Sequence, residues 1–123
     1  MTSTFIKTFC TFVLLITSLS PVSSLAVTNK TGGVSYYSDF LHGRATASGQ
    51  LYDKNKLTAA HKKLAFGTKV RVTDLHNNKS VVVTIIDRGP FVKGRIIDLS
   101  LAAAKKIDLV RKGVSKIKLE VLK

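Results

Sequence analysis

Cysteine and long apolar stretches are scarce in this chain of 123 residues. Its one cysteine, Cys10, lies in an N-terminal segment that we expect to be removed, which leaves no thiol for a disulfide bond or for catalysis. The fold must therefore rest on its apolar core. His42 and His76 have no acidic or cysteine partner at metal-ligand spacing, and no phosphate-binding loop or nucleotide motif occurs. The sequence predicts neither a metal site nor a cofactor.

The one extended apolar stretch, residues 9–16, lies between Lys7 and Pro21 and is too short to cross a bilayer comfortably. Ser24 and Ala26 supply small residues at the −3 and −1 positions of a cleavage site. Residues 1–26 are therefore predicted to be a signal peptide, with an uncleaved membrane anchor as the alternative. A lipid-modified cysteine would follow the apolar stretch, whereas Cys10 lies inside it, so we do not expect a lipoprotein. The remaining 97 residues predict one small exported domain, monomeric and not inserted in a membrane, in the periplasm, cell envelope or medium.

Acidic residues are also few, with 7 Asp and Glu against 20 Lys and Arg. A net charge of +13 favours a polyanionic partner. Nucleic acid suits an exported protein poorly, and no basic run with interleaved aromatic residues appears. Anionic cell-wall polymer or acidic lipid head groups fit better. The alternative is that surplus lysines simply keep a small domain soluble.

Short strand patterns dominate the exported part. Residues 27–32 read as a short flexible lead-in and residues 38–53 as an irregular loop. Ser100 is placed to cap a short helix over residues 101–107. Apolar segments, some of them alternating, predict strands at residues 33–37, 69–74, 80–86 and 114–122, with a hairpin turn at 76–79. Residues 57–60 and 96–97 are two further short apolar segments. A small closed β-barrel is the natural outcome, because closure removes exposed strand edges.

The segment Asp87-Arg88-Gly89-Pro90 is the most informative in the chain. It follows an apolar strand, and Pro90 lacks the N–H that a strand ladder needs, so the chain must turn there. Asp87 is therefore predicted to lie at the edge of a surface cleft, where a single carboxyl group can transfer protons. The alternative is a strand-end aspartate that caps its own turn.

Six blocks in this order resemble the RlpA-like family of double-psi β-barrels, which includes endolytic peptidoglycan transglycosylases of the bacterial envelope. The blocks are VSYY at 34–37, GRATASG at 43–49, LTAAH at 57–61, FGTKVRV at 66–72, DRGPF at 87–91 and GRIIDLS at 94–100. The resemblance implies a mainly β fold, a six-stranded double-psi β-barrel with one or two short helices, over residues 33–123. The first block departs from the family at its end, with Ser38 where the family commonly has glycine.

The same resemblance implies a reaction and its residues. Asp87 matches the family's catalytic aspartate and His61 its active-site histidine. The implied reaction cleaves the β-1,4 bond between N-acetylmuramic acid and N-acetylglucosamine and leaves 1,6-anhydro ends. Gln50 stands where the family usually has glutamate, and an amide can hydrogen-bond a sugar but cannot exchange a proton. For His61 the alternative is a histidine that orders a loop.

Further side chains are candidates for binding the glycan. Tyr36 and Tyr37 occupy adjacent strand positions and point to opposite faces, so one packs in the core and the other can stack on a sugar. Asp98 lies in a stretch similar to that around an essential aspartate of expansins, with helix capping as the alternative. Arginines can bind wall carboxylates, and we expect Arg88 to point away from Asp87. The predicted substrate-binding residues are Gln50, Arg44, Tyr37, Arg88, Arg95 and Asp98.

Three functions remain open from the sequence. The first is a peptidoglycan lytic transglycosylase with Asp87 as acid and base and His61 assisting, acting on glycan strands. The second is an expansin-like module that binds and loosens the wall without cutting it, which Gln50 favours. The third is a secreted basic binding domain without a role in the wall.

Overall fold

The computed structural model describes residues 29–122, and the predicted signal peptide lies outside this range. Among the described residues no helix has the length and apolar character needed to cross a membrane. The elements in chain order are β1 (Asn29–Tyr36), the 3-10 helix η2 (Asp39–Leu41), β2 (Thr58–Ala60), β3 (Lys69–Asp74), β4 (Ser80–Asp87), β5 (Arg95–Leu99), α3 (Leu101–Lys106) and β6 (Ser115–Val121).

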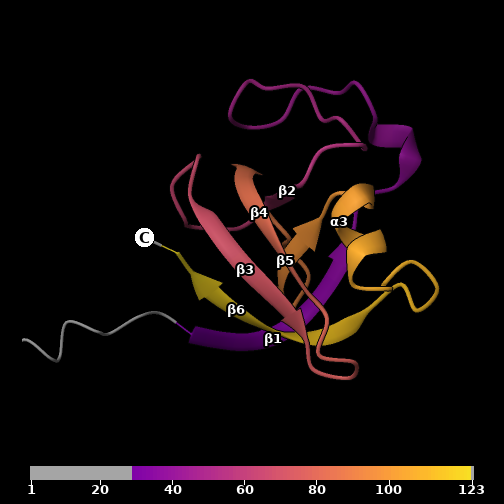
Figure 1. Ribbon diagram of the computed structural model, residues 1–123. Coiled ribbons are helices and arrows are strands. Elements are labelled where there is room, and N and C mark those ends of the chain that lie inside the picture. Colours follow the sequence, from indigo (N-terminus) through magenta and orange to yellow (C-terminus); the bar gives the residue numbers. More distant parts are fainter. Residues whose placement is uncertain (1–28, 123) are drawn as a thin grey trace, which may run out of the picture.

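The strands close into a barrel in the order β1-β5-β2-β4-β3-β6 (Figure 1). β1 pairs with β5, and β2 with β4, in parallel, whereas the other neighbours are antiparallel. The prediction of a mainly β, six-stranded closed barrel with short helices is confirmed. Because β2 and β4 run in parallel, their carboxyl ends meet, and Ala60 is the register partner of Asp87.

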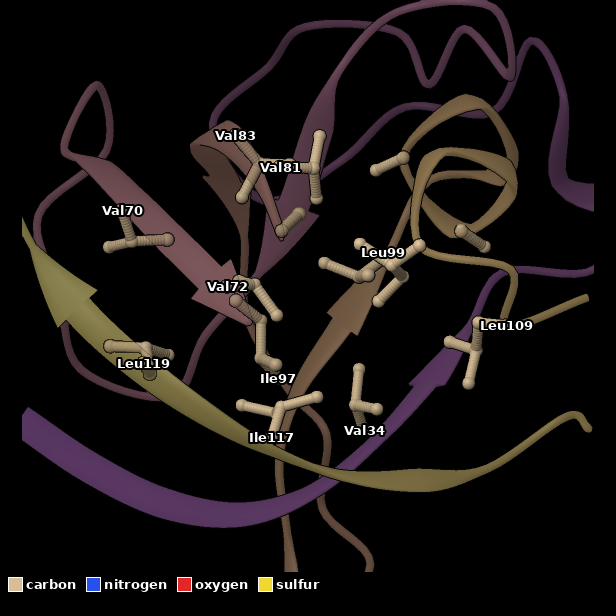
Figure 2. Packing of buried hydrophobic residues seen from close by; sticks show 14 of the residues in the cluster. Val34, Val70, Val72, Val81, Val83, Ile97, Leu99, Leu109, Ile117 and Leu119 are labelled. Atoms are coloured by element: carbon tan, nitrogen blue, oxygen red, sulfur yellow. The ribbon is translucent and has the colours of Figure 1, made fainter. Parts of the chain in front are cut away.

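The barrel interior is filled by aliphatic side chains from every strand (Figure 2). Val70 and Val72 on β3 face Val81 and Val83 on β4, and their exposed neighbours alternate with them. Each fully buried aliphatic side chain of this size contributes about 1.5–3 kcal/mol. Since no disulfide bond is present in residues 29–122, which contain no cysteine, this burial carries the stability of the fold.

The predicted helix forms directly after β5. Ser100 accepts a hydrogen bond from the backbone amide of Ala103 at 3.2 Å, which satisfies a free amide of the first turn. Its hydroxyl also donates to the carbonyl of Lys56 at 2.6 Å and so ties the loop before β2 to the helix start. The helix ends at Lys106, one residue before the predicted end, and Ile107 is its C-cap.

The predicted lead-in is partly wrong. β1 begins at Asn29, four residues before the predicted start, and residues 29–32 pair with residues 117–120 of β6. The side chains at 29–31 are exposed, so the apolar alternation that marks a strand is missing there although the backbone is paired. The strand also ends at Tyr36 rather than at Tyr37.

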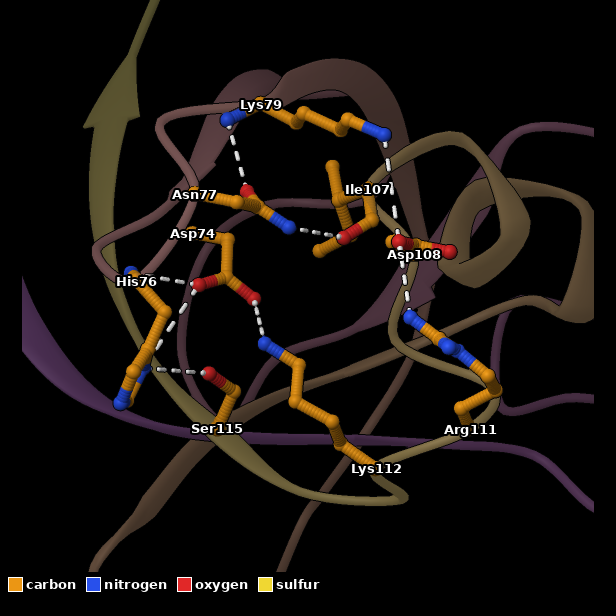
Figure 3. A network of polar contacts seen from close by, with 9 residues as sticks. All are labelled: Asp74, His76, Asn77, Lys79, Ile107, Asp108, Arg111, Lys112 and Ser115. Atoms are coloured by element: carbon orange, nitrogen blue, oxygen red, sulfur yellow. Dashed lines mark hydrogen bonds and ion pairs between the residues drawn. The ribbon is translucent and has the colours of Figure 1, made fainter.

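A buried carboxylate ties the end of β3 to the loop before β6 (Figure 3). Asp74 is 0% exposed and accepts hydrogen bonds from the His76 amide at 2.7 Å and Lys112 Nζ at 3.1 Å. Burial raises the pKa of Asp74, but the hydrogen bonds from His76, Lys112 and Ser115 together outweigh burial and lower it. Since the network lies beside the start of β4, it is at the opposite end of that strand from Asp87.

Candidate active site

Asp87 ends β4 and is held there by three hydrogen-bond donors. The backbone amides of Ala47 and Arg88 donate to Oδ1 at 2.8 and 2.9 Å. The hydroxyl of Tyr37 donates to Oδ2. Oδ1 therefore has two partners and Oδ2 one, so Oδ2 keeps a lone pair for a further partner. The three hydrogen bonds fix the orientation of the Asp87 carboxyl group and leave Oδ2 able to accept one more.

Tyr37 connects this carboxylate to the barrel wall. Its ring lies 4.7 Å from the ring of Tyr52, which is 3% exposed and accepts a hydrogen bond from the Leu101 amide at 3.0 Å. Burial raises the pKa of Tyr37, and the hydrogen bond to Asp87 raises it further. The phenol is therefore a stable donor to Asp87 across the physiological pH range.

A cavity of about 170 Å³ opens beside the carboxylate, and Asp87, Tyr37, Arg44, Thr46 and Tyr52 are among its lining residues. One wall is the turn at residues 46–50. Its Ser48 amide donates to the Ile86 carbonyl at 3.2 Å, so the turn is docked on the end of β4. The arrangement places one carboxyl group, one phenol and one guanidinium around a space open to solvent.

Gln50 closes the same turn through its backbone. Its carbonyl accepts hydrogen bonds from the amide of Thr46 at 2.9 Å and from the hydroxyl of Thr46 at 2.7 Å. The residue itself is exposed. Gln50 therefore stands on the turn that carries the Ala47 donor to Asp87.

Arg88 points away from Asp87, as predicted. Its Nη1 donates to the carbonyls of His61 and Leu64 at 3.1 and 2.8 Å, and its guanidinium carbon lies 4.1 Å from the centre of the Phe66 ring. These contacts hold the loop that follows β2. Its predicted contact with substrate stays a prediction, and the hydrogen bonds that the structure describes are to the protein.

His61 is a neighbour of Asp87 through the backbone, since its amide donates to the Asp87 carbonyl at 3.1 Å. Its Nδ1 accepts hydrogen bonds from the amides of Lys63 and Leu64 at 3.0 and 3.1 Å. Burial lowers the pKa of His61, and the nearby charges of Arg88 and three lysines lower it further. The ring is therefore neutral at pH 7, with its proton on Nε2. It lines a second cavity rather than the one beside Asp87.

Asp98 lies between these two places. On β5 it pairs with Ala60, whose partner on β4 is Asp87, so the three residues form one row across the sheet. Its charge raises the pKa of Tyr37, and its Oδ1 lies 3.6 Å from Nε of Arg95. Burial raises the pKa of Asp98, and Arg95 opposes that shift.

The structure thus gathers Asp87, Tyr37 and Arg44 in one cavity and places His61 and Arg95 in another. Sequence reasoning missed Tyr52 and the Ala47 amide, since a buried tyrosine and a backbone donor carry no motif of their own. Within residues 29–122 no group of three metal-ligating side chains gathers.

A six-stranded closed barrel with two parallel pairs and a carboxylate at the end of β4 defines the chain as a small double-psi β-barrel. A family model described as "Lytic transglycolase" matches residues 29–119. The chain belongs to the lytic transglycolase family.

Curated relatives are closely similar in sequence. The chain is 53% identical over 91 residues to the endolytic peptidoglycan transglycosylase RlpA of Pasteurella multocida, which covers 74% of this chain and 31% of the relative. It is 50% identical over 93 residues to the probable enzyme of that name from Synechocystis, with 76% and 29% coverage. The chain thus spans about a third of the length of the curated relatives it matches.

Solved structures show the same fold at lower identity. The Streptomyces papain inhibitor aligns with a TM-score of 0.64 and 24% identity, over 78% of this chain and 96% of the inhibitor. An expansin of Clavibacter michiganensis aligns with a TM-score of 0.61 and 20% identity, over 78% and 51% of the two chains. These likenesses confirm the double-psi barrel and carry no function.

Proposed function

We propose that this protein is an exported peptidoglycan transglycosylase of the lytic type, active in the bacterial envelope or outside the cell. The observation that carries the proposal is the Asp87 carboxyl group, oriented by three donors beside an open cavity. The names of the curated relatives support the substrate class.

The proposed reaction begins with a proton on Oδ2 of Asp87, the oxygen with a free lone pair. That proton passes to the glycosidic O4 of N-acetylglucosamine while the bond from C1 of N-acetylmuramic acid to O4 breaks. Tyr37 and the two amides keep the carboxyl group aimed during the transfer, and positive charge develops on the sugar ring as in other glycoside cleavages.

The second step uses the carboxylate as a base. Asp87 takes the proton of the C6 hydroxyl, O6 attacks C1 of the same sugar, and a 1,6-anhydro ring forms. One bond has broken, one has formed, and the proton that Asp87 gave has been replaced. No water is consumed and no second carboxylate is needed, which is consistent with an amide side chain at Gln50 on the neighbouring turn.

Other residues have supporting roles in this proposal. Arg44, which lines the Asp87 cavity, binds polar groups of the glycan. Gln50 stands on the neighbouring turn and can hydrogen-bond a sugar hydroxyl. Arg88 holds the loop after β2. His61 in that loop is neutral, so its Nε2–H can donate a hydrogen bond to the glycan but the ring supplies no positive charge. No step calls for a metal or a cofactor.

A second candidate function is a non-catalytic expansin-like module that binds the wall. The observation that favours it is Gln50, which removes a proton-exchanging side chain from a turn that contacts Asp87. Here Asp87 and Asp98 would bind sugar hydroxyl groups without cleaving the chain.

Incubation of the purified protein with peptidoglycan separates the two functions. The transglycosylase predicts soluble fragments with 1,6-anhydro ends in mass spectrometry, and Asp87→Asn abolishes them while circular dichroism stays unchanged. Asp39→Asn is the matched control, since Asp39 is exposed in η2 and has no place in the Asp87 cavity. Fragments with reducing ends, or full activity of Asp87→Asn, would refute the proposed mechanism. Binding to the wall without any soluble product would favour the expansin-like module.

A further inference from the structure

A second cavity, of about 220 Å³, has a strongly basic lining. Four of the six side chains around it carry a positive charge, namely Lys30, Lys62, Lys63 and Arg95, and His61 and Ile96 complete it. Water occupies about 30 Å³ per molecule, so the space holds about seven waters or one short chemical group. These residues thus form a defined hollow rather than a scattered basic surface.

The topology builds this hollow from three distant segments. Lys30 comes from β1, Arg95 from β5 and the two other lysines from the loop after β2. β1 approaches β5 closely, because a Cβ atom on Gly32 would lie 2.7 Å from the Ile96 side chain and one on Gly33 would lie 2.9 Å from the Gly94 carbonyl. Glycines at both positions permit the approach that brings Lys30 beside Arg95.

The positive charges of the cavity are poorly compensated within the described chain. Lys30, Lys62 and Lys63 take part in none of the ion pairs formed among residues 29–122. Arg95 has Asp98 at 3.6 Å, yet Nε of Arg95 and Oδ1 of Asp98 are both buried without a hydrogen-bond partner in this part of the molecule. Like charges that converge on one hollow repel one another, and a bound anion would remove that repulsion.

The cavity is also connected to the proposed catalytic centre. Asp98 lies near enough to Tyr37, which lines the Asp87 cavity, for its charge to raise the pKa of that phenol. Asp98 also forms an ion pair with Arg95, which lines the basic cavity. The His61 amide bonds to the Asp87 carbonyl, while the same residue lines the basic cavity. His61 and Asp98 therefore link the two cavities, and a glycan bound at Asp87 that extends past His61 would present a substituent to the basic cavity.

We propose that this cavity is a subsite for a carboxylate carried by the N-acetylmuramic acid residue of the glycan. The inference rests on the proposed function and adds the group that this face of the barrel recognises. The carboxylate belongs either to the free lactyl group of the sugar or to the stem peptide attached to it. Ammonium groups suit such a ligand because each offers three rotatable donors to an oxyanion.

Equilibrium binding tests the subsite without requiring turnover. The double variant Lys30→Gln/Lys62→Gln is made in the Asp87→Asn background, and Lys105→Gln/Lys106→Gln on α3 serves as the control with the same change in net charge. The probes are glycan strands stripped of peptides, strands that retain them, and stripped strands whose carboxylates have been converted to methylamides. All four lysines are exposed, so neither double variant threatens the fold.

We expect the cavity variant to bind carboxylate-bearing strands about tenfold more weakly, as two partly exposed charge contacts allow, and the control to change less than twofold. On the methylamide strands the two variants should bind alike. A loss on stripped strands identifies the lactyl carboxylate, and a loss confined to peptide-bearing strands identifies the stem. Equal losses in both variants, or a loss that persists on methylamide strands, would overturn the subsite.

The outcome is separable from that of the proposed function. Carboxylate-dependent binding without cleavage by the unsubstituted protein would leave the subsite in place and refute the transglycosylase. Cleavage that proceeds while the cavity and control variants bind equally would refute the subsite alone.

Discussion

Replacement of Tyr37 by phenylalanine removes one donor from Asp87 and little else. The hydroxyl that donates to Oδ2 is lost, whereas the ring that lies 4.7 Å from Tyr52 is retained. The amides of Ala47 and Arg88 still hold Oδ1. The substitution therefore frees the catalytic oxygen to rotate or to take a water molecule, without opening a cavity in the barrel.

The magnitude follows from the kind of bond lost. Oδ2 becomes charged as Asp87 gives its proton to the leaving oxygen. A hydrogen bond to a charged group contributes about 1.5–3 kcal/mol, and partial exposure of Tyr37 and Asp87 reduces this to about 1–2 kcal/mol, since water can replace the phenol. If that loss falls on the oriented transition state, kcat decreases by about 5- to 30-fold. Substrate binding through other groups is untouched, so KM stays nearly constant.

The measurement is the initial rate of release of 1,6-anhydro-ended fragments at several substrate concentrations. Tyr36→Phe is a matched control, because it removes the same atom from the adjacent residue, whose hydroxyl donates to the Val110 carbonyl at 3.3 Å. Unchanged kcat in Tyr37→Phe would show that the phenol does not orient the acid. An equal fall in both variants would assign the effect to the strand as a whole.

Two other substitutions test the buried Asp74 network and the loop that Arg88 holds beside the site. Asp74→Asn should lower the free energy of unfolding in urea by about 2 kcal/mol at pH 7, because it removes the charge partner of Lys112. The pKa of Asp74 is lowered by folding, so the difference from the parent protein is present above the ordinary value of 3.8 and shrinks as pH falls through the folded pKa; a constant difference would contradict this. Arg88→Gln should speed amide hydrogen exchange in residues 61–64 and reduce activity about tenfold by loosening the loop, whereas Arg111→Gln, which loses an exposed pair with Asp108, should do neither.

The fold was largely predictable because apolar patterns and turn residues mark four of the six strands, and the segments of β2 and β5 stand out as short apolar elements. The first strand was drawn too short, since residues 29–32 pair through their backbone while the side chains at 29–31 face solvent. The order of strands around the barrel came from the resemblance to a family. Alternation records which face of a strand is buried but not which strand lies beside it.

The sequence predicts the central carboxylate of the candidate site but not the groups that surround it. Asp87 carries a local signal, a polar residue between an apolar strand and Gly-Pro. Two of the three donors that orient it come from Tyr37 and Ala47, 50 and 40 residues away, and nothing local in the sequence joins them to Asp87. The lysines at 30 and 62 likewise converge only because β1 and the loop after β2 flank β5.

Ala60 explains how one end of the barrel can serve both cavities. It is 1% exposed and is the register partner of both Asp98 on β5 and Asp87 on β4, so a small buried side chain stands at the middle position of the row. Residues opposite one another on adjacent strands project from the same side of a sheet. Because Ala60 is already buried, a longer side chain at this position would have to displace the groups packed around it and would disturb the row of Asp87 and Asp98. The small residue therefore lets Asp87 and Asp98 occupy neighbouring positions of one row, with Asp87 at the proposed acid site and Asp98 beside Arg95 of the proposed subsite.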